Sequence, residues 1–165
     1  MNKKNSQCHI DLNVNGFSIQ QIELPDELKQ AVTNNDFNLI DQIISKLVTP
    51  KGELFVFMSQ FCPVKSIEHI ISLRDANNEW EEDGIWHDDG SRVMAFSLSL
   101  TVDPQQVEGG ILEIRKKGDK ESLKISTPTY GDIIVFQTGQ SGYEHKINQV
   151  FKGKRLIIAG WCYPE

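Results

Sequence analysis

The first third of the chain carries an apolar pattern with helical spacing. Pro25 followed by two acidic residues predicts a helix start, because proline suits the first turn and acidic side chains complement the positive end of the helix dipole. Residues 34–36, Asn-Asn-Asp, predict a break and a new cap. Beyond them, apolar residues recur every three or four positions and stop before Pro50: Phe37, Ile40, Ile43, Ile44, Leu47 and Val48. We expect this helical face to pack against a sheet.

From Glu53 onward the pattern changes to short β-branched and aromatic runs separated by turn residues. About eight strands are predicted at this spacing: ELFVFMSQF, IEHIISL, RVMAFSLSLTV, GGILEIRKK, ESLKIST, DIIVFQT, EHKINQV and RLIIAGW. The sequence therefore predicts an α+β fold, a mostly antiparallel double-stranded β-helix (jelly roll) supported by N-terminal helices. We expect one domain over residues 1–165, with the helical support at about 24–49 and the jelly-roll core at about 53–163.

The predicted strand from Arg92 to Val102 separates its residues by size. One face is large and apolar: Met94, Phe96, Leu98 and Leu100. The other is small or polar: Val93, Ala95, Ser97, Ser99 and Thr101. Because strand side chains alternate between faces, the second set either lines a pocket for a compact polar ligand or faces solvent, and the pattern fits both.

Composition narrows the class of protein. The three cysteines are odd in number and far apart, which excludes a disulfide framework and a C-x-x-C zinc site. No apolar run is long enough for a signal peptide or a membrane span, so we expect a cytoplasmic protein with no membrane partner. The net charge of −6 and the scattered basic residues argue against nucleic acid as a partner. The oligomeric state is left open.

A His-x-Asp motif at His87 and Asp89 is the first candidate for metal chemistry. On an extended strand, residues two apart point to the same side, so an imidazole and a carboxylate can face one metal. His145, on a late predicted strand, is the candidate third ligand, because early and late strands can lie side by side in a rolled double sheet. Two histidines and one carboxylate on one face of the metal leave positions open, as Fe(II) oxygenases require. Chance His-x-Asp pairs and solvated histidines are the competing explanation.

Arg155 adds an anion-binding element to this set. It opens an apolar strand on which Arg155, Ile157 and Trp161 share a face, so the guanidinium points inward if the apolar residues do. No acidic residue lies nearby on that strand face, and a guanidinium fork matches a carboxylate in two parallel hydrogen bonds. A dicarboxylate whose 2-oxo acid end chelates the metal would satisfy both features. The alternative is that Arg155 points to solvent beside the neighbouring lysines.

With these residues in place, the region from His87 to Trp161 resembles the prolyl 4-hydroxylase branch of the Fe(II)/2-oxoglutarate-dependent dioxygenases, above all the intracellular oxygen-sensing type. The matching elements also include Arg92, the run Glu108-Gly-Gly-Ile-Leu-Glu-Ile114 and the run Gly131-Asp-Ile-Ile-Val-Phe136. The resemblance covers about half of the chain and implies Fe(II) held by His87, Asp89 and His145, with 2-oxoglutarate and O2 as cosubstrates and ascorbate as a possible added reductant.

The resemblance also implies roles around the cosubstrate. Arg155 would bind the far carboxylate of 2-oxoglutarate, and Leu112 would line that pocket. Such prolyl hydroxylases place a tyrosine where this chain has Ser99, which is too short to replace a phenol. A water or Tyr143 is therefore an alternative second contact. The implied reaction hydroxylates an unactivated C–H bond and releases succinate and CO2.

A protein or peptide side chain is the expected substrate, with proline favoured by the resemblance. The acidic segment around Trp80 and Trp86 reads as a loop at the pocket entrance and favours a cationic or peptide substrate. An alkylation-repair-type nucleic-acid demethylase is a weaker alternative, because that branch looks for a second arginine where this chain has Trp161. A small-molecule hydroxylase and a degenerate jelly-roll binding module are the remaining alternatives.

Overall fold

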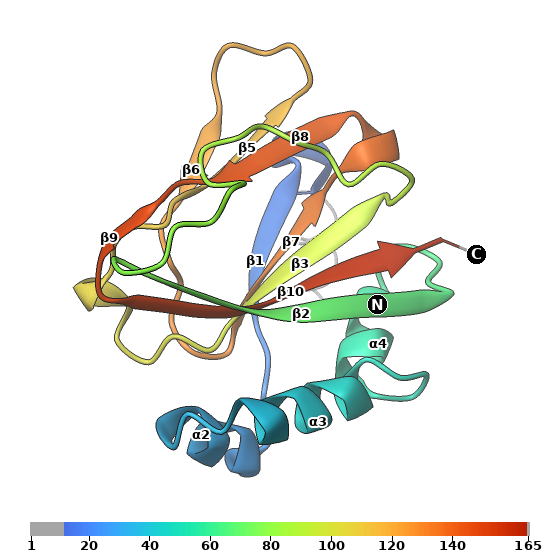
Figure 1. Cartoon of the computed structure of the whole chain (residues 1–165). Coiled ribbons are helices and arrows are strands. Elements are labelled where there is room, and N and C mark those ends of the chain that lie inside the picture. Colours follow the sequence, from blue (N-terminus) through green and yellow to red (C-terminus); the bar gives the residue numbers. More distant parts are fainter. Residues whose placement is uncertain (1–11, 165) are drawn as a thin grey trace.

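Residues 12–164 are described in the computed structural model, in which a five-stranded and a three-stranded antiparallel sheet, together with a two-stranded one, lie over a layer of helices (Figure 1). The helices are α2 (Asp26–Thr33), α3 (Phe37–Leu47) and α4 (Glu53–Met58), and two short 3-10 turns are η1 (Pro104–Gln106) and η2 (Gly139–Ser141). The strands are β1 (Phe17–Gln21), β2 (Ser66–Asp75), β3 (Met94–Ser99), β4 (Glu108–Gly109), β5 (Leu112–Lys116), β6 (Leu123–Ile125), β7 (Asp132–Gln137), β8 (Tyr143–Ile147), β9 (Val150–Lys152) and β10 (Lys154–Tyr163).

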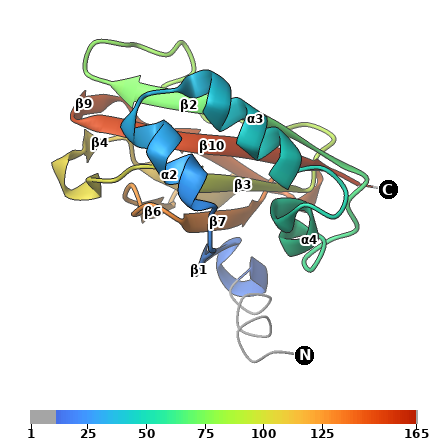
Figure 2. The same cartoon turned by 90° about the horizontal axis from the view of Figure 1, so that it is seen from below.

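The helical starts follow the sequence signals. Pro25 is the residue before α2, and two acidic residues occupy the first turn. The Asp36 side chain caps α3 by accepting a hydrogen bond of 3.0 Å from the Leu39 N–H. The apolar face of α3 packs against the larger sheet as predicted, and Figure 2 shows α2 and α3 lying across that sheet. Phe37 is the member of this face that stays partly exposed.

The segment from Glu53 to Phe61 was predicted as a strand, and this is wrong, because α4 occupies Glu53–Met58. Leu54 and Met58 are its buried residues, and they lie one helical turn apart. A continuous apolar run is compatible in composition with either a buried strand or a short helix. The burial of two residues four positions apart distinguishes the helix, and that burial depends on the packing of α4 beside α3.

The larger sheet has the order β1-β7-β3-β10-β2, and the smaller sheets have the orders β6-β5-β8 and β4-β9. Every paired strand is antiparallel to its neighbours. All ten residues of the edge strand β2 pair with β10 in one continuous register, from Ser66↔Tyr163 to Asp75↔Lys154. The helices cover one face of the larger sheet, and the three-stranded sheet lies over the other.

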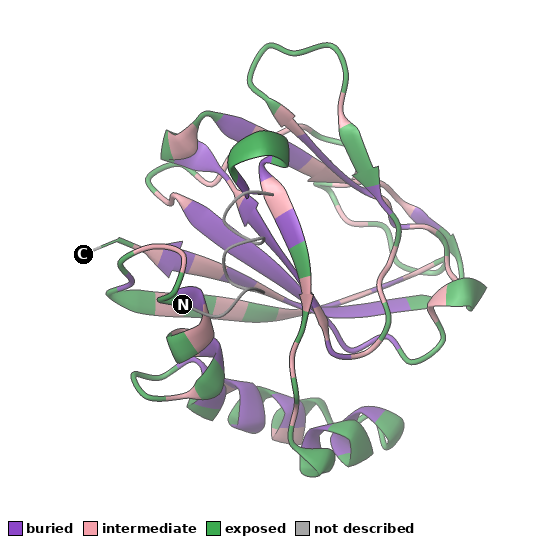
Figure 3. Ribbon diagram, turned by 180° about the vertical axis from the view of Figure 1, so that it is seen from behind, coloured by how far each residue is buried: buried purple, intermediate pink, exposed green. Residues whose placement is uncertain are grey.

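The strand β3 separates these two sides of the larger sheet. Met94, Phe96 and Leu98 belong to the core between the sheet and the helices, whereas Ala95 packs in the core between the two sheets. Every residue of β3 is buried, and Ala95 and Ser97 line a cavity, so the small face of this strand is not a solvated surface and forms a pocket wall at these two residues. Figure 3 shows the buried central strands and the exposed connecting loops. Within the described part of the chain, no helix has the length and apolar character to cross a membrane.

Candidate active site

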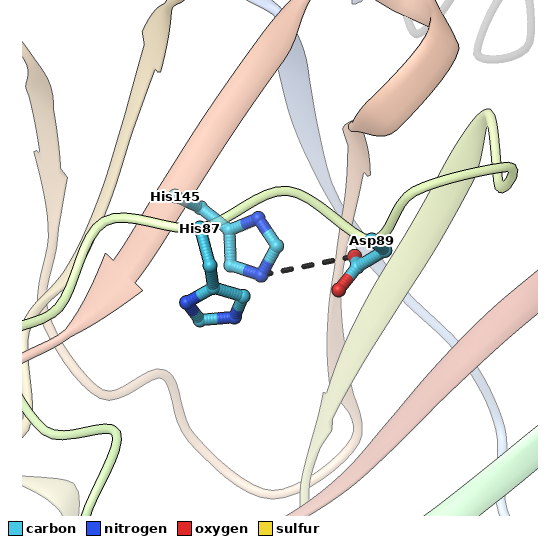
Figure 4. Close-up of side chains that lie close together, drawn as sticks. All are labelled: His87, Asp89 and His145. Atoms are coloured by element: carbon cyan, nitrogen blue, oxygen red, sulfur yellow. Dashed lines mark ion pairs between the residues drawn. The ribbon is translucent and has the colours of Figure 1, made fainter.

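His87, Asp89 and His145 come together at one end of the space between the sheets (Figure 4). One ligand atom from each lies within 4.8 Å of the others. His145 is in the middle of β8, and His87 forms an isolated antiparallel bridge with it, with backbone hydrogen bonds of 3.0 and 2.9 Å. Asp89 follows two residues later, so the i, i+2 relation holds although the segment is a loop with one bridge and not a full strand.

The surroundings of these three residues suit a metal ion. His145 is buried, and this burial lowers its pKa to about 4 despite the opposing charge of Asp89, so the imidazole is neutral at pH 7. Asp89 Oδ2 lies 3.8 Å from His145 Nε2, and this buried oxygen has no hydrogen-bond partner among residues 12–164. A neutral imidazole and a buried, unsatisfied carboxylate oxygen are the groups that a divalent cation would satisfy.

Two hydrogen bonds orient the histidines. His87 Nδ1 lies 3.0 Å from the Ile85 carbonyl, which leaves its Nε2 for a metal. The Thr138 hydroxyl lies 3.5 Å from His145 Nδ1 and accepts the Asp89 N–H at 3.3 Å. Asp88, the competing carboxylate, instead forms an ion pair with Lys117, which lowers the pKa of Asp88.

Arg155 is fully buried at the start of β10, on the same face of the strand as Ile157, which lines the cavity, but Arg155 is not itself part of the cavity wall. Its Nε and Nη1 have no hydrogen-bond partner in the described chain. Burial and, to a smaller extent, the nearby Arg74 together lower its pKa to about 9 against the opposing charge of Asp83, so Arg155 remains charged at pH 7. A Cβ placed on Gly110 would lie 2.8 Å from Arg155 Cδ, so glycine at this position leaves the room that the Arg155 side chain occupies.

The other predicted cosubstrate contacts divide into two groups. Leu112 lines the cavity. Ser99 does not, because its hydroxyl donates to the Pro128 carbonyl at 2.7 Å and accepts the Thr101 N–H at 3.2 Å. Tyr143 is buried in the core between the sheets and is likewise absent from the cavity wall. On the same strand as Ser99, Ser97 does line the cavity, and its buried hydroxyl has no hydrogen-bond partner in residues 12–164.

Arg74 was missed by the sequence analysis. It lies directly opposite Arg155 in the β2–β10 register and lines the cavity. Its Nε donates to Asp83 Oδ1 at 3.1 Å, and its guanidinium stacks on the Trp80 ring at 4.2 Å. Arg74 is brought beside Arg155 by the pairing of two strands that are distant in the sequence. In the sequence itself, Arg74 stands out only as a charged residue at the end of a mostly apolar run.

The cavity has a volume of about 1030 Å³ and joins the three candidate ligands to the edge strand β2. Its wall includes Trp80 and Arg92. Trp86 is not part of it, because this ring lies against Arg115 at 3.8 Å and Lys146 at 4.8 Å. The two tryptophans of the acidic segment therefore have different surroundings, and only Trp80 faces the site.

Residues 74–163, just over half of the chain, match the model of the 2OG-Fe(II) oxygenase superfamily. The chain belongs to this superfamily. The matched segment begins at Arg74 and contains His87, Asp89, His145 and Arg155, and membership implies Fe(II), 2-oxoglutarate and O2 as the groups the family uses. The sequence-based resemblance to this family is thereby confirmed.

Several known hydroxylases resemble the chain over most of its length. A PKHD-type hydroxylase of Prochlorococcus marinus (strain MIT 9312) is 27% identical over 137 residues, which are 81% of this chain and 59% of that protein. A Pseudomonas putida prolyl-4-hydroxylase structure has a TM-score of 0.62 at 20% identity, covering 98% of this chain and 95% of that one. A prolyl hydroxylase from Trichoplax adhaerens, solved with a peptide fragment of the hypoxia inducible factor oxygen degradation domain, has a TM-score of 0.67 at 14% identity, covering 98% and 89%.

These solved structures confirm the predicted fold class, a double-stranded β-helix with supporting helices. The chain spans 59% of the length of the first two curated relatives that it matches.

Proposed function

We propose that this protein is an Fe(II)- and 2-oxoglutarate-dependent hydroxylase of a protein or peptide side chain, with proline the favoured target. The observation that carries the proposal is the convergence of His87, Asp89 and His145 within 4.8 Å, in one cavity of a superfamily-matched domain. Two imidazoles and a carboxylate leave positions open on Fe(II), as this chemistry requires.

Each residue has a separate role in this proposal. His87, Asp89 and His145 would hold the metal, and Arg155 would bind the distal carboxylate of 2-oxoglutarate through its unpaired N–H groups. Leu112 would close the apolar wall beside the cosubstrate and exclude water. With 2-oxoglutarate and O2, the bound iron supplies the oxidising power for C–H hydroxylation, and succinate and CO2 are the released products.

A polypeptide substrate is supported by the size and rim of the cavity. At about 1030 Å³ the cavity reaches the upper end of the range for small-molecule sites, so a compact dicarboxylate leaves room for a second ligand. Its rim carries exposed Ile70 and Ile85 beside Glu81 and Glu82. The Trichoplax adhaerens relative was solved with a peptide, which supports the same substrate class.

The test measures succinate release and peptide hydroxylation with Fe(II), ascorbate, 2-oxoglutarate and proline-containing peptides. We expect His145→Ala to abolish both products and to abolish binding of Mn(II) as a stable substitute for iron. Arg155→Met should leave Mn(II) binding intact and weaken 2-oxoglutarate binding by roughly tenfold to a hundredfold, because a charge-assisted bidentate contact is lost.

A matched pair of acidic variants tests the ligand assignment. Asp89→Asn should weaken Mn(II) binding, whereas Asp88→Asn should leave it unchanged, since Asp88 is engaged by Lys117. Equal Mn(II) affinities in these two variants would contradict the ligand set. Succinate release with no peptide hydroxylated would retain the cofactor proposal and reject the polypeptide substrate.

A further inference from the structure

The edge strand β2 has a row of backbone groups that the fold leaves open. In an antiparallel pair, the N–H and C=O of one residue point to one neighbouring strand and those of the next residue point to the other. The Leu156 carbonyl accepts the Leu100 N–H at 3.0 Å. The backbone N–H and C=O groups of even-numbered β10 residues therefore point toward β3, and those of odd-numbered residues point toward β2. Because Ile157 is paired with Ser72, the backbone N–H and C=O groups of even-numbered β2 residues point toward β10.

The outward groups are therefore those of Ile67, His69, Ile71 and Leu73. Trp80 agrees with this assignment, because its Nε1–H donates to the Leu73 carbonyl from the outer side at 3.3 Å. Within residues 12–164, the N–H and C=O groups of Ile67, His69 and Ile71 have no partner on this side, where β2 ends the sheet. Edge strands commonly carry lysine, proline or a bulge that prevents pairing, and the β2 sequence SIEHIISLRD has no lysine or proline.

This edge borders the mouth of the cavity. The side chains of Ile70 and Ser72 line the cavity, and Ile70 is 42% exposed. Across the mouth lies the segment that carries Ile85 and His87, which extends the three-stranded sheet through the His87–His145 bridge. A strand added to β2 would thus run between the two sheets, along the opening that leads to the candidate metal ligands.

We propose that an extended segment of the substrate polypeptide adds to the outer edge of β2 as an antiparallel strand, with its target side chain pointing into the cavity. This inference rests on the proposed function. Peptide residues opposite Ile70 and Ser72 would share their face and point into the cavity, while the alternate residues exchange hydrogen bonds with His69 and Ile71.

The antiparallel direction is compatible with proline as the target. In this direction a residue whose side chain enters the cavity turns its own N–H away from β2, so proline loses no hydrogen bond there. In the parallel direction the cavity-facing residues would be those that bond to β2, and proline would be excluded. Glu81 and Glu82 line the cavity and form no ion pair within the described chain, so a segment with lysine or arginine beside the target is favoured.

His69 allows a matched test of the edge. His69→Pro removes one outward N–H and places a ring on the edge, whereas His69→Ala removes the same side chain, including its 3.0 Å contact with Asp41, and keeps the N–H. The probe is a set of end-blocked nine-residue peptides, each with one central proline flanked by a lysine and with its other positions varied. Both variants should bind 2-oxoglutarate and Mn(II) alike.

We expect the peptides to slow amide hydrogen exchange at His69 and Ile71 by at least about tenfold in the Zn(II) and 2-oxoglutarate complex. Hydroxylation by His69→Pro should have a kcat/KM about tenfold below that of His69→Ala, the size expected for a lost hydrogen bond and added steric hindrance. Equal values, or unchanged exchange at these amides with every peptide, would overturn the proposal.

Two further outcomes separate this inference from the proposed function and from another occupant. Slowed exchange without hydroxylation would support docking and reject the hydroxylase proposal. A dimer in sedimentation that His69→Pro dissociates and His69→Ala retains would identify a second copy of the chain on β2, and would overturn the peptide assignment.

Discussion

Thr138 is a fully buried threonine whose hydroxyl touches two of the three candidate ligand residues. It accepts the Asp89 N–H at 3.3 Å and lies 3.5 Å from His145 Nδ1. Such contacts fix the ring orientation and the tautomer of a metal-binding histidine. At the scale of single residues, the site therefore depends on groups that carry no recognisable motif, because a threonine after a strand is common in any sequence.

We predict that Thr138→Val weakens Mn(II) binding by roughly tenfold to a hundredfold, the range found for the loss of such supporting contacts. The substitution nearly preserves volume, so the unfolding temperature should change much less than the affinity does. Competition with a fluorescent chelator gives the metal affinity, and circular dichroism gives the unfolding curve. An unchanged affinity would show that the Thr138 hydroxyl does not orient His145.

A serine pair on β3 separates a structural hydroxyl from one that faces the ligand. Ser99→Ala should cost about 1–3 kcal/mol of unfolding free energy, because it leaves the Pro128 carbonyl and the Thr101 N–H without their partner. It should leave 2-oxoglutarate affinity unchanged. Ser97→Ala should instead weaken 2-oxoglutarate affinity and leave the unfolding free energy nearly unchanged. The Ser97 residue lines the cavity, and its buried hydroxyl has no hydrogen-bond partner within residues 12–164.

Urea unfolding and calorimetric titration of the Mn(II)-loaded protein with 2-oxoglutarate check this serine pair. A weakened affinity in Ser99→Ala at unchanged stability would instead make Ser99 a cosubstrate contact, at the position where such prolyl hydroxylases have a tyrosine.

At the scale of elements, the apolar periodicity of the sequence predicted the helices and strands whose conformation is set by their own local sequence. The helices α2 and α3 and most strands were predicted because each carries its own start signal and apolar repeat. The helix α4 was not, since its apolar run lacks a period of its own and tertiary packing decides its conformation. His-x-Asp was found from sequence spacing, but the cross-strand position of Arg74 was not, because it depends on which strand pairs with β10.

Close packing between β3 and β10 gives an element-scale prediction. A Cβ on Gly160 would overlap the ring of Phe96, which is fully buried between the larger sheet and the helices. We therefore expect Gly160→Ala to cost about 1–3 kcal/mol of unfolding free energy, the usual range for overpacking. Phe96→Leu combined with Gly160→Ala should cost less than the sum of the single changes, because the smaller side chain leaves room for the methyl group. Additive costs in urea unfolding would contradict this contact.

At the scale of the whole molecule, the site lies where the two sheets come apart. The larger sheet contributes Arg74 and Ser97 to the cavity wall and carries the buried Arg155, and the three-stranded sheet contributes His145. The segment between β2 and β3 connects these layers and carries His87 and Asp89. Sequence alone could name most of these residues but could not bring them together, because the contacts join strands that are distant along the chain.

Arg74 and Asp83 fasten this connecting segment to the larger sheet. Their side chains are 8% and 10% exposed, and Asp83 Oδ2 also accepts the Trp80 N–H at 3.4 Å. Arg74→Met should cost about 3–5 kcal/mol of unfolding free energy, because it leaves the Asp83 carboxylate buried without its partner. Because the segment continues to His87, the same variant should speed amide exchange over residues 76–86 and weaken Mn(II) binding.

The double variant Arg74→Met/Asp83→Asn distinguishes a mechanical role from an electrostatic one. Removing both charges should recover most of the lost unfolding free energy, since no uncompensated carboxylate remains. It should not recover Mn(II) affinity if the ion pair holds the segment in place, because the neutral pair no longer fastens residues 76–86 to β2. Full recovery of both in urea unfolding and metal titration would show that Arg74 only neutralises Asp83. Recovery of stability without metal affinity would establish that Arg74 positions the metal-binding segment across the two sheets.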